Sequence, residues 1–268
     1  METAANNNDN GGGGGVRKSS HPLPWLNLMV TEPFYLFHFL TFFSYVAVRS
    51  SASQNLPPDF SRHLLHREAQ AFLTFSVLAA IKMVKQETWE AFIADALLYA
   101  KGLLCALALI VDKHLALCYL LGFLVIFILT QQPPYDGLGD ASHLTPLQLE
   151  SKLTEGNTSK FWLVEFRSVC SACIRTSRIF PDLSTVYSNR NLSFGIVDLG
   201  HFPNAAEKFG IALNDPLPIY ILFENNAEVA RLPYINSESK ASMPIIRKNL
   251  LCQHFELDRR LIEHISRK

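Results

Sequence analysis

Residues 161–173 read FWLVEFRSVCSAC, and this stretch decides how the second half of the chain folds. Its first six residues are apolar and β-prone apart from one acid, which is typical of a buried strand. Two cysteines, Cys170 and Cys173, follow closely, and a helical pattern continues from them to about Tyr187. The stretch therefore predicts a strand followed by a Cys-x-x-Cys dithiol that opens a helix.

The residues around this stretch alternate between helix and strand patterns. Thr145, with Pro146 next and Gln148 three residues on, forms a capping box for a short helix that ends near Leu153. Asn225-Asn226 suits a hairpin turn. We expect strands at 192–197, 218–223 and 228–233, a short helix at 204–209, and a C-terminal helix capped by Asp258. This order predicts an α/β domain, a mixed sheet flanked by helices on both faces.

The first half of the chain has a different composition. Residues 25–130 are dominated by long runs of Leu, Phe, Ala, Ile and Val, whereas the later residues have the mixed charge of a soluble domain. The Asn-, Gly- and Ser-rich residues 1–24 cannot bury enough apolar surface to fold, so we expect a disordered tail. We assign 25–130 to a helical membrane region of up to four hydrophobic segments, 131–142 to a linker and 143–268 to the α/β domain.

The hydrophobic segments differ in how well they fit a membrane span. Residues 25–48 are long enough to cross about 30 Å of hydrocarbon, although a cleaved secretory signal is an alternative. Residues 49–68 are polar and predict a loop, and 69–81 predict a marginal span or an interfacial helix. Residues 91–111 and the charge-free 115–130 predict two more spans. Two charged residues inside 91–111, Asp95 and Lys101, are expected to reach the headgroups from near a helix end.

Charge and cysteine content exclude several functions. The chain has 24 Lys plus Arg and 24 Asp plus Glu, so no excess of positive charge indicates a nucleic-acid partner. Its five cysteines are too few and too scattered for a disulfide framework. A zinc site at the dithiol would need two further ligands, and the candidates His201, Cys252 and His254 lack the usual paired spacing. We therefore expect no metal and no other cofactor; burial of both dithiol cysteines in the core is a second alternative.

The order of strand, Cys-x-x-Cys, helix and a later strand opened by proline resembles the thioredoxin fold, through VEF, CSAC, FPDLS, FGIVDLG and LPIYILF. With its hydrophobic front half, which Pro133-Pro134-Tyr135 joins to the domain, the whole chain resembles the thioredoxin-related transmembrane protein 2 subfamily. Five residues differ from the usual thioredoxin pattern: Val169 replaces a tryptophan, Ser171-Ala172 a Gly-Pro, Arg178 a proline and Ile196 a lysine.

The chemistry of a dithiol at a helix start assigns a role to each sulfur. Unpaired backbone N–H groups favour the thiolate of Cys170, which makes it the nucleophile, and Cys173 one turn later is the resolving thiol. The resemblance implies that Leu217 and Pro218, joined by a cis bond, form the wall on which a substrate lies; an ordinary strand-opening proline is the alternative. It also implies that Glu165 is a buried acid that relays a proton, and burial predicts a raised pKa for it.

We therefore expect a membrane-anchored thiol-disulfide oxidoreductase of the endoplasmic reticulum membrane, acting on protein thiols or disulfides. The alternative is a redox sensor or adaptor that binds membrane protein partners. Basic residues occur in several loops, so the positive-inside rule does not fix the orientation. Four spans would put both ends in the cytosol, which favours a cytosolic domain. Glycans at the sequons that begin at Asn157 and Asn191 would instead place the domain in the lumen.

Overall fold

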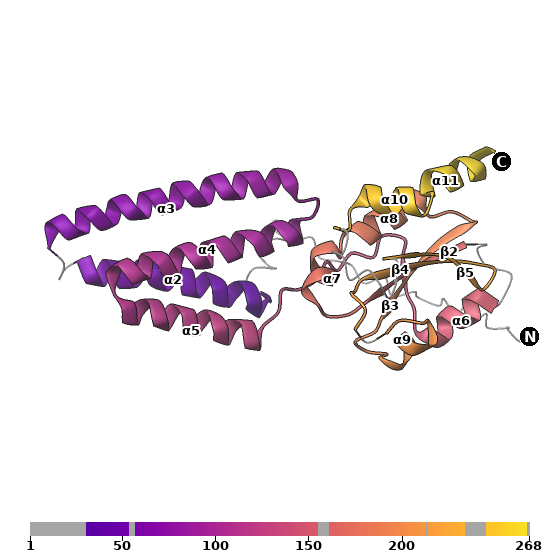
Figure 1. Ribbon diagram of the computed structural model, residues 1–268, viewed down its shortest axis with the longest axis horizontal. Helices are drawn as coiled ribbons and strands as arrows, with labels where there is room; N and C mark the ends of the chain where they lie inside the picture. The colour runs from indigo at the N-terminus through magenta and orange to yellow at the C-terminus, as the bar shows by residue number, and fades with distance from the viewer. Residues whose placement is uncertain (1–30, 54–56, 155–160, 213, 234–244, 267–268) are drawn as a thin grey trace, which may run out of the picture.

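The computed structural model describes residues 31–53, 57–154, 161–212, 214–233 and 245–266, and it contains a helical part followed by an α/β part (Figure 1). The predicted disordered tail and the Asn157 sequon lie outside these residues. The helical part consists of α2 (Pro33–Ser53), α3 (Pro58–Lys85), α4 (Trp89–Val111) and α5 (Lys113–Leu129).

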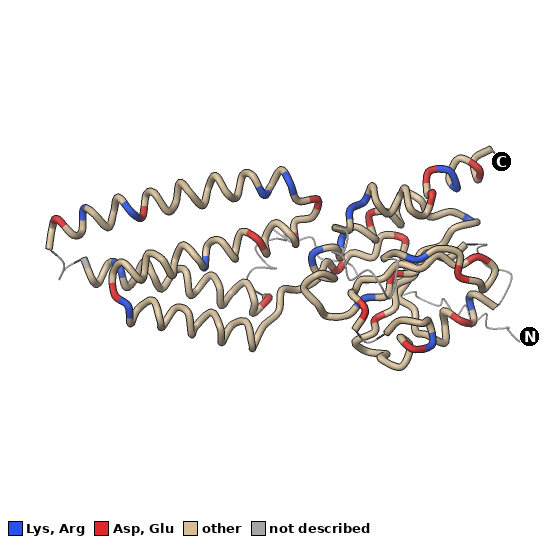
Figure 2. The backbone as a smooth tube through the Cα atoms, in the orientation of Figure 1, with Lys and Arg blue, Asp and Glu red and all other residues tan. Residues whose placement is uncertain are grey.

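Helices α4 and α5 pack against each other and against α2. Buried residues of α4 and α5, including Leu104 and Phe123, form one apolar cluster, and Phe42 and Tyr45 of α2 pack against it. By length and composition, α4 is the one helix of the described residues that can cross a membrane. Helix α5 is more apolar than α4 but has only 17 residues. Figure 2 shows that charged residues are sparse along α5 and along the middle of α4.

The loop predicted at residues 49–68 is wrong. Helix α2 continues to Ser53 and α3 already begins at Pro58, whose missing N–H is no loss at the first helical position. The polar residues that suggested a loop pair between the two helices instead: Arg49 and Glu68 form an ion pair of 2.9 Å. As a result α3 has 28 residues, far more than the segment predicted at 69–81.

The α/β part is built on a five-stranded sheet in the order β1-β3-β2-β4-β5. Strands β1, β3 and β2 are parallel, and β4 and β5 are antiparallel to their neighbours. The strands are β1 (Ser142–His143), β2 (Phe161–Arg167), β3 (Leu192–Asp198), β4 (Ile219–Glu224) and β5 (Ala227–Leu232). The helices are α6 (Pro146–Thr154), α7 (Ser171–Thr176), α8 (Ile179–Tyr187), α9 (Asn204–Lys208), α10 (Lys248–His254) and α11 (Leu257–Ser266).

The sheet has an apolar core on each face. One core joins the sheet to α8, α10 and α11, with Phe180 and Leu251 fully buried. The other joins it to α6 and α9, around Leu149 and Phe166. In Figure 1 these two groups of helices lie on opposite sides of the strands. The predicted fold class, a mixed sheet flanked by helices and preceded by a helical region, is therefore confirmed.

Several local predictions are confirmed at the level of single hydrogen bonds. The Thr145 N–H donates to Gln148 Oε1 at 3.0 Å, and the Gln148 N–H donates to Thr145 Oγ1 at 3.2 Å, which is the reciprocal capping box. Asn225 and Asn226 both have positive φ and join β4 to β5 as a two-residue turn.

Two predictions about helix limits are wrong. The helix after the dithiol is divided at Ser177 into α7 and α8. Asp258 does not cap the last helix, because α11 begins one residue earlier, at Leu257. Its carboxylate instead accepts a hydrogen bond of 2.6 Å from the Tyr187 hydroxyl, which ties α11 to α8.

The segment between α5 and β1 runs along the α/β part and contacts it. The backbone N–H of Tyr135 donates to Ser177 Oγ, and that of Asp140 donates to Ser184 Oγ, both at 2.9 Å. Gly139 adopts a φ of +57° where the segment passes α8. These bonds attach the residues predicted as a linker to the helices that follow the dithiol.

Candidate functional site

The dithiol lies at the start of α7, just after the central strand β2. Cys170 is the N-cap residue of α7, and its Sγ accepts a hydrogen bond of 3.3 Å from the backbone N–H of Cys173. The two sulfur atoms are 2.8 Å apart, and both are free thiols. Cys170 is partly exposed, whereas Cys173 is buried. A reagent in solution can therefore reach the first sulfur before the second.

The surroundings of the two sulfurs shift their pKa values in opposite directions. A hydrogen bond from Cys173, helped by the backbone N–H groups of Cys173 and Ala172, outweighs burial and lowers the pKa of Cys170 from 9.0 to about 6. The same sulfur contact, together with burial, raises the pKa of Cys173. At neutral pH the exposed sulfur is therefore a thiolate and the buried one a thiol.

The Leu217-Pro218 bond lies directly beside the dithiol. This peptide bond is cis, as the resemblance predicted, and it immediately precedes β4. The Leu217 carbonyl oxygen is 3.9 Å from Cys170 Sγ. The structure therefore brings together the four residues predicted to react with or contact a substrate.

Glu165 lies on β2 and is completely buried. On the adjacent strands it is paired with Ile196 and with Tyr220, whose hydroxyl donates to Glu165 Oε1 at 3.1 Å. The other carboxyl oxygen, Oε2, has no hydrogen-bond partner among the described residues. Burial raises the pKa of Glu165 to about 7, against smaller lowering effects of Arg167 and Tyr220.

Glu165 also has an electrostatic influence on the buried thiol. The negative charge of Glu165 is one of the causes that raise the pKa of Cys173. An acid with a pKa near 7 is present in both protonation states at neutral pH, so it can accept a proton and return it. The arrangement thus contains a partly exposed thiol, a buried thiol and a buried carboxyl group with a pKa of about 7.

The sequence did not reveal how the helical part contacts the dithiol helix. Asp95 does not reach toward headgroups as expected; it is buried and forms ion pairs with Arg175 of α7 at 2.7 Å and with Lys82 at 2.9 Å. Thr88 caps α4 and also donates its hydroxyl to the Arg175 carbonyl oxygen at 2.6 Å. No signal in the sequence could pair these residues with Arg175, because Asp95 and Thr88 lie 80 and 87 positions before it.

The three candidate zinc ligands each contact a different residue. His201 is exposed and pairs with Asp198 at 3.0 Å, and Cys252 Sγ lies 3.6 Å from the Tyr187 hydroxyl. His254 hydrogen-bonds the Arg231 carbonyl oxygen at 3.0 Å. Within the described ranges, no group of three or more His, Cys, Asp or Glu residues could hold a metal ion.

The sheet order, the dithiol at the helix start and the cis proline opposite it together define a thioredoxin-like protein, with a helical region that includes a candidate membrane span. The chain is 27% identical over 237 residues to thioredoxin-related transmembrane protein 2 of Xenopus tropicalis, covering 82% of this chain and 80% of that protein. It is 26% identical over 184 residues to the Caenorhabditis elegans homolog, covering 67% and 69%. These similarities confirm the predicted resemblance. No protein-family model matches the chain.

Solved thioredoxin structures match parts of the chain. The reduced Schistosoma mansoni thioredoxin pre-protein is 26% identical and covers 35% of this chain and 84% of its own, with a TM-score of 0.30. Plasmodium falciparum thioredoxin is 18% identical and covers 43% and 96%, with a TM-score of 0.33.

Proposed function

We propose that this chain is a membrane-anchored thiol-disulfide oxidoreductase that exchanges disulfides with protein substrates through Cys170 and Cys173. The observation that carries the proposal is the opposite shift of the two thiol pKa values. One sulfur is partly exposed and ionised, and the other is buried, protonated and 2.8 Å away. A dithiol with this asymmetry can attack a partner and then release it.

The exchange has two steps, and each step breaks one disulfide bond and forms another. The Cys170 thiolate attacks one sulfur of a substrate disulfide, so that bond breaks, a mixed disulfide forms and the leaving thiolate takes up a proton. Cys173 then loses its proton and attacks Cys170 Sγ, which releases the second substrate thiol and leaves a Cys170-Cys173 disulfide. The substrate gains two electrons and the dithiol loses two; a thiol reductant restores it, and the reverse sequence oxidises a substrate dithiol.

Glu165 would take the proton of Cys173 in the second step. Its carboxyl has one oxygen held by Tyr220 and a second without a hydrogen-bond partner among the described residues. With a pKa of about 7, a large fraction of the carboxyl is ionised at neutral pH and can act as the base. Leu217 and Pro218 would hold the substrate segment beside Cys170, since the Leu217 carbonyl oxygen lies 3.9 Å from its sulfur and Pro218 follows directly.

We place the protein in the endoplasmic reticulum membrane with the dithiol on the cytosolic side. The sequon at Asn191 tests the orientation, because this residue lies in the turn between α8 and β3. A glycosidase-sensitive mass shift of the full-length protein, abolished by Asn191→Gln, would place the dithiol in the lumen and overturn this part of the proposal.

A redox-regulated adaptor is the second candidate function. Val169, directly before the dithiol, is 60% exposed, and an exposed aliphatic side chain at that position can bind a partner protein without any exchange. In this case the dithiol would control binding and would not turn over substrates.

One trapping experiment separates the two functions. In full-length protein, Cys173→Ser prevents the second step, so an oxidoreductase accumulates mixed disulfides that dithiothreitol releases. Cys170→Ser must abolish them, and Cys252→Ser, which removes a buried thiol outside the site, must not. Recovery of partners that dithiothreitol does not release, with no covalent species, would favour the adaptor.

A further inference from the structure

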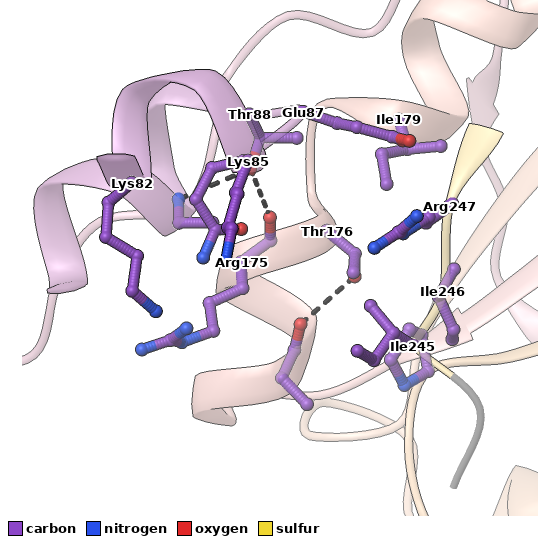
Figure 3. Close-up of a pocket in the computed structure, with 14 residues that line it drawn as sticks. Lys82, Lys85, Glu87, Thr88, Arg175, Thr176, Ile179, Ile245, Ile246 and Arg247 are labelled. Carbon is purple, nitrogen blue, oxygen red and sulfur yellow. Dashed lines mark hydrogen bonds between the residues drawn. The ribbon is translucent and has the colours of Figure 1, made fainter. Parts of the chain in front are cut away.

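A pocket of about 430 Å³ lies between the dithiol helix and the turn that joins α3 to α4 (Figure 3). Ala172, one of the two residues between the cysteines, forms part of its wall, and so does Pro218 after the cis bond. The pocket therefore borders two residues that lie close to Cys170 in the sequence or across the cis bond. Its far side belongs to the helical part of the chain.

Basic side chains outnumber acidic ones in this pocket. Its basic lining residues are Lys82, Lys85, Arg175 and Arg247. Glu87 is the one acidic lining residue among those described, and its carboxylate accepts a hydrogen bond of 2.9 Å from the backbone N–H of Lys248. The pocket therefore has a positive character that the neutral chain as a whole does not have.

Two of the four basic residues share one acidic partner, and the other two have none among the described residues. Lys82 and Arg175 share the carboxylate of Asp95. In the described part of the chain, neither Lys85 nor Arg247 forms an ion pair within 4.0 Å. Figure 3 shows Arg247 pointing toward Thr176 from the side opposite Lys85. An anionic group entering the pocket would thus meet two cations from different elements.

The rest of the lining is aliphatic. Ile179, Ile245 and Ile246 contribute to the wall, and Ile245 is 76% exposed. A purely polar ligand would leave this surface uncovered, whereas a peptide with both acidic and aliphatic side chains would cover it. The pocket composition therefore fits a peptide segment better than a small inorganic anion.

We propose that this pocket is a specificity site that binds acidic residues next to the reacting cysteine of a protein substrate. The inference rests on the proposed exchange reaction at Cys170 and adds a substrate class to it. Lys85 and Arg247 would attract the acidic side chains, while Ala172 and Pro218 hold the neighbouring backbone near the sulfur. Because Lys85 ends α3 of the helical part, the selection would depend on both parts of the chain.

The test uses full-length Cys173→Ser protein in neutral detergent micelles. The probes are two peptides of equal length, each with one cysteine. The cysteine is flanked by Asp in one peptide and by Asn in the other. In both peptides the cysteine sulfur forms a mixed disulfide with nitrothiobenzoate. Attack of Cys170 on the peptide sulfur releases nitrothiobenzoate, whose absorbance gives the rate. We expect the Asp peptide to react about three to ten times faster than the Asn peptide, because one or two partly exposed ion pairs stabilise a complex by about this much. Raising the salt concentration should reduce this ratio.

Charge removal identifies the responsible residues. Lys85→Gln and Arg247→Gln should each lower the rate of the Asp peptide more than the rate of the Asn peptide, and so reduce the preference for the Asp peptide. Arg190→Gln removes an exposed basic residue elsewhere and is the matched control, so it should leave the preference intact. Equal rates for both peptides in the Cys173→Ser parent, or a preference that survives both pocket changes, would overturn the inference.

Failure of the exchange reaction itself gives a different result. If neither peptide releases nitrothiobenzoate, the proposed function fails along with the specificity site, whereas equal release from both removes only the site. The same reaction in nanodiscs tests a different occupant, because an anionic lipid headgroup could bind in the same basic pocket. Loss of the Asp preference in phosphatidylserine nanodiscs, but not in phosphatidylcholine nanodiscs, would assign the pocket to lipid and overturn the peptide assignment.

Discussion

Asp95 of α4 and Arg175 of α7 form an ion pair of 2.7 Å that connects the helical part of the chain to the helix carrying the dithiol. The same carboxylate accepts hydrogen bonds from Lys82 and Gln86, so a single buried acid gathers three donors from two parts of the molecule. Cys173, the buried cysteine of the dithiol, lies on the same helix two residues before Arg175. The orientation of the dithiol helix therefore depends on a residue in the candidate membrane span.

Asp95→Asn should destabilise the contact between α4 and α7. The substitution leaves Arg175 and Lys82 without their shared anion, and loss of a charged hydrogen-bond partner costs about 1–3 kcal/mol. Hydrogen exchange of the α7 amides in the full-length protein should become faster. Asp182→Asn removes the anion of a more exposed pair with Arg178 and should change exchange little. Equal protection of α7 in both variants would contradict this role of Asp95.

Alkylation of Cys170 should depend on pH with a midpoint near 6, because the Cys173 contact and two backbone N–H groups favour the thiolate. Iodoacetamide labelling followed by mass spectrometry measures the rate at each sulfur, and Cys173 should stay unlabelled in this range. Cys173→Ala removes the donor and should move the midpoint toward 9, whereas Cys173→Ser keeps a hydroxyl donor and should move it less. The same midpoint in both variants would falsify the importance of the sulfur contact.

Glu165→Gln should change how stability depends on pH. The unfolded carboxyl releases its proton near pH 4.5 and the folded one near 7, so the folded protein binds more protons between these values and loses stability as the pH rises. Above pH 7 the full cost, about 3 kcal/mol, is present. The amide carries no such cost, so the Tm of the variant minus that of the parent should increase from pH 4.5 to 7. Glu207→Gln, on the exposed side of α9, should show no such increase.

Gly139→Ala should destabilise the α/β part by about 2 kcal/mol or more. Gly139 has a φ of +57°, and an added Cβ would overlap the Pro181 carbonyl oxygen and Ser184 Oγ of α8. The thermal unfolding temperature of the full-length protein reports the loss. Gly122→Ala is the matched control, since nothing lies within 4 Å of the added atom there, and it should not lower that temperature. A similar fall in both variants would mean that Gly139 is not constrained by α8.

The sequence predicted best those features that depend on neighbouring residues. The capping box of Thr145 and Gln148 and the turn at Asn225-Asn226 each involve positions no more than three apart, so their residue types are informative by themselves. The strands were predicted because each is a short apolar run bounded by polar residues. The roles of Cys170, Cys173, Glu165, Leu217 and Pro218 remain predictions that the experiments above address.

The features that were missed depend on contacts between distant segments. The polar residues of 49–68 suggested a loop because their partner is another helix, as with Arg49 and Glu68. Asp95 was assigned to a membrane surface because Arg175, its partner, lies 80 residues further on. The short strand β1 has only two residues, too few to form a sequence pattern, and it exists because it pairs with Gly195 and Ile196 of β3.

The strand neighbours of Glu165, Ile196 and Tyr220, carry no charge at neutral pH, so neither of them holds this carboxyl in its ionised form. Its titration therefore falls near the pH of living compartments. Release of a covalently attached partner would slow where the surroundings are acidified and quicken where they are alkaline. Compartment acidity, and not only the supply of reductant, would then set how long each partner stays attached.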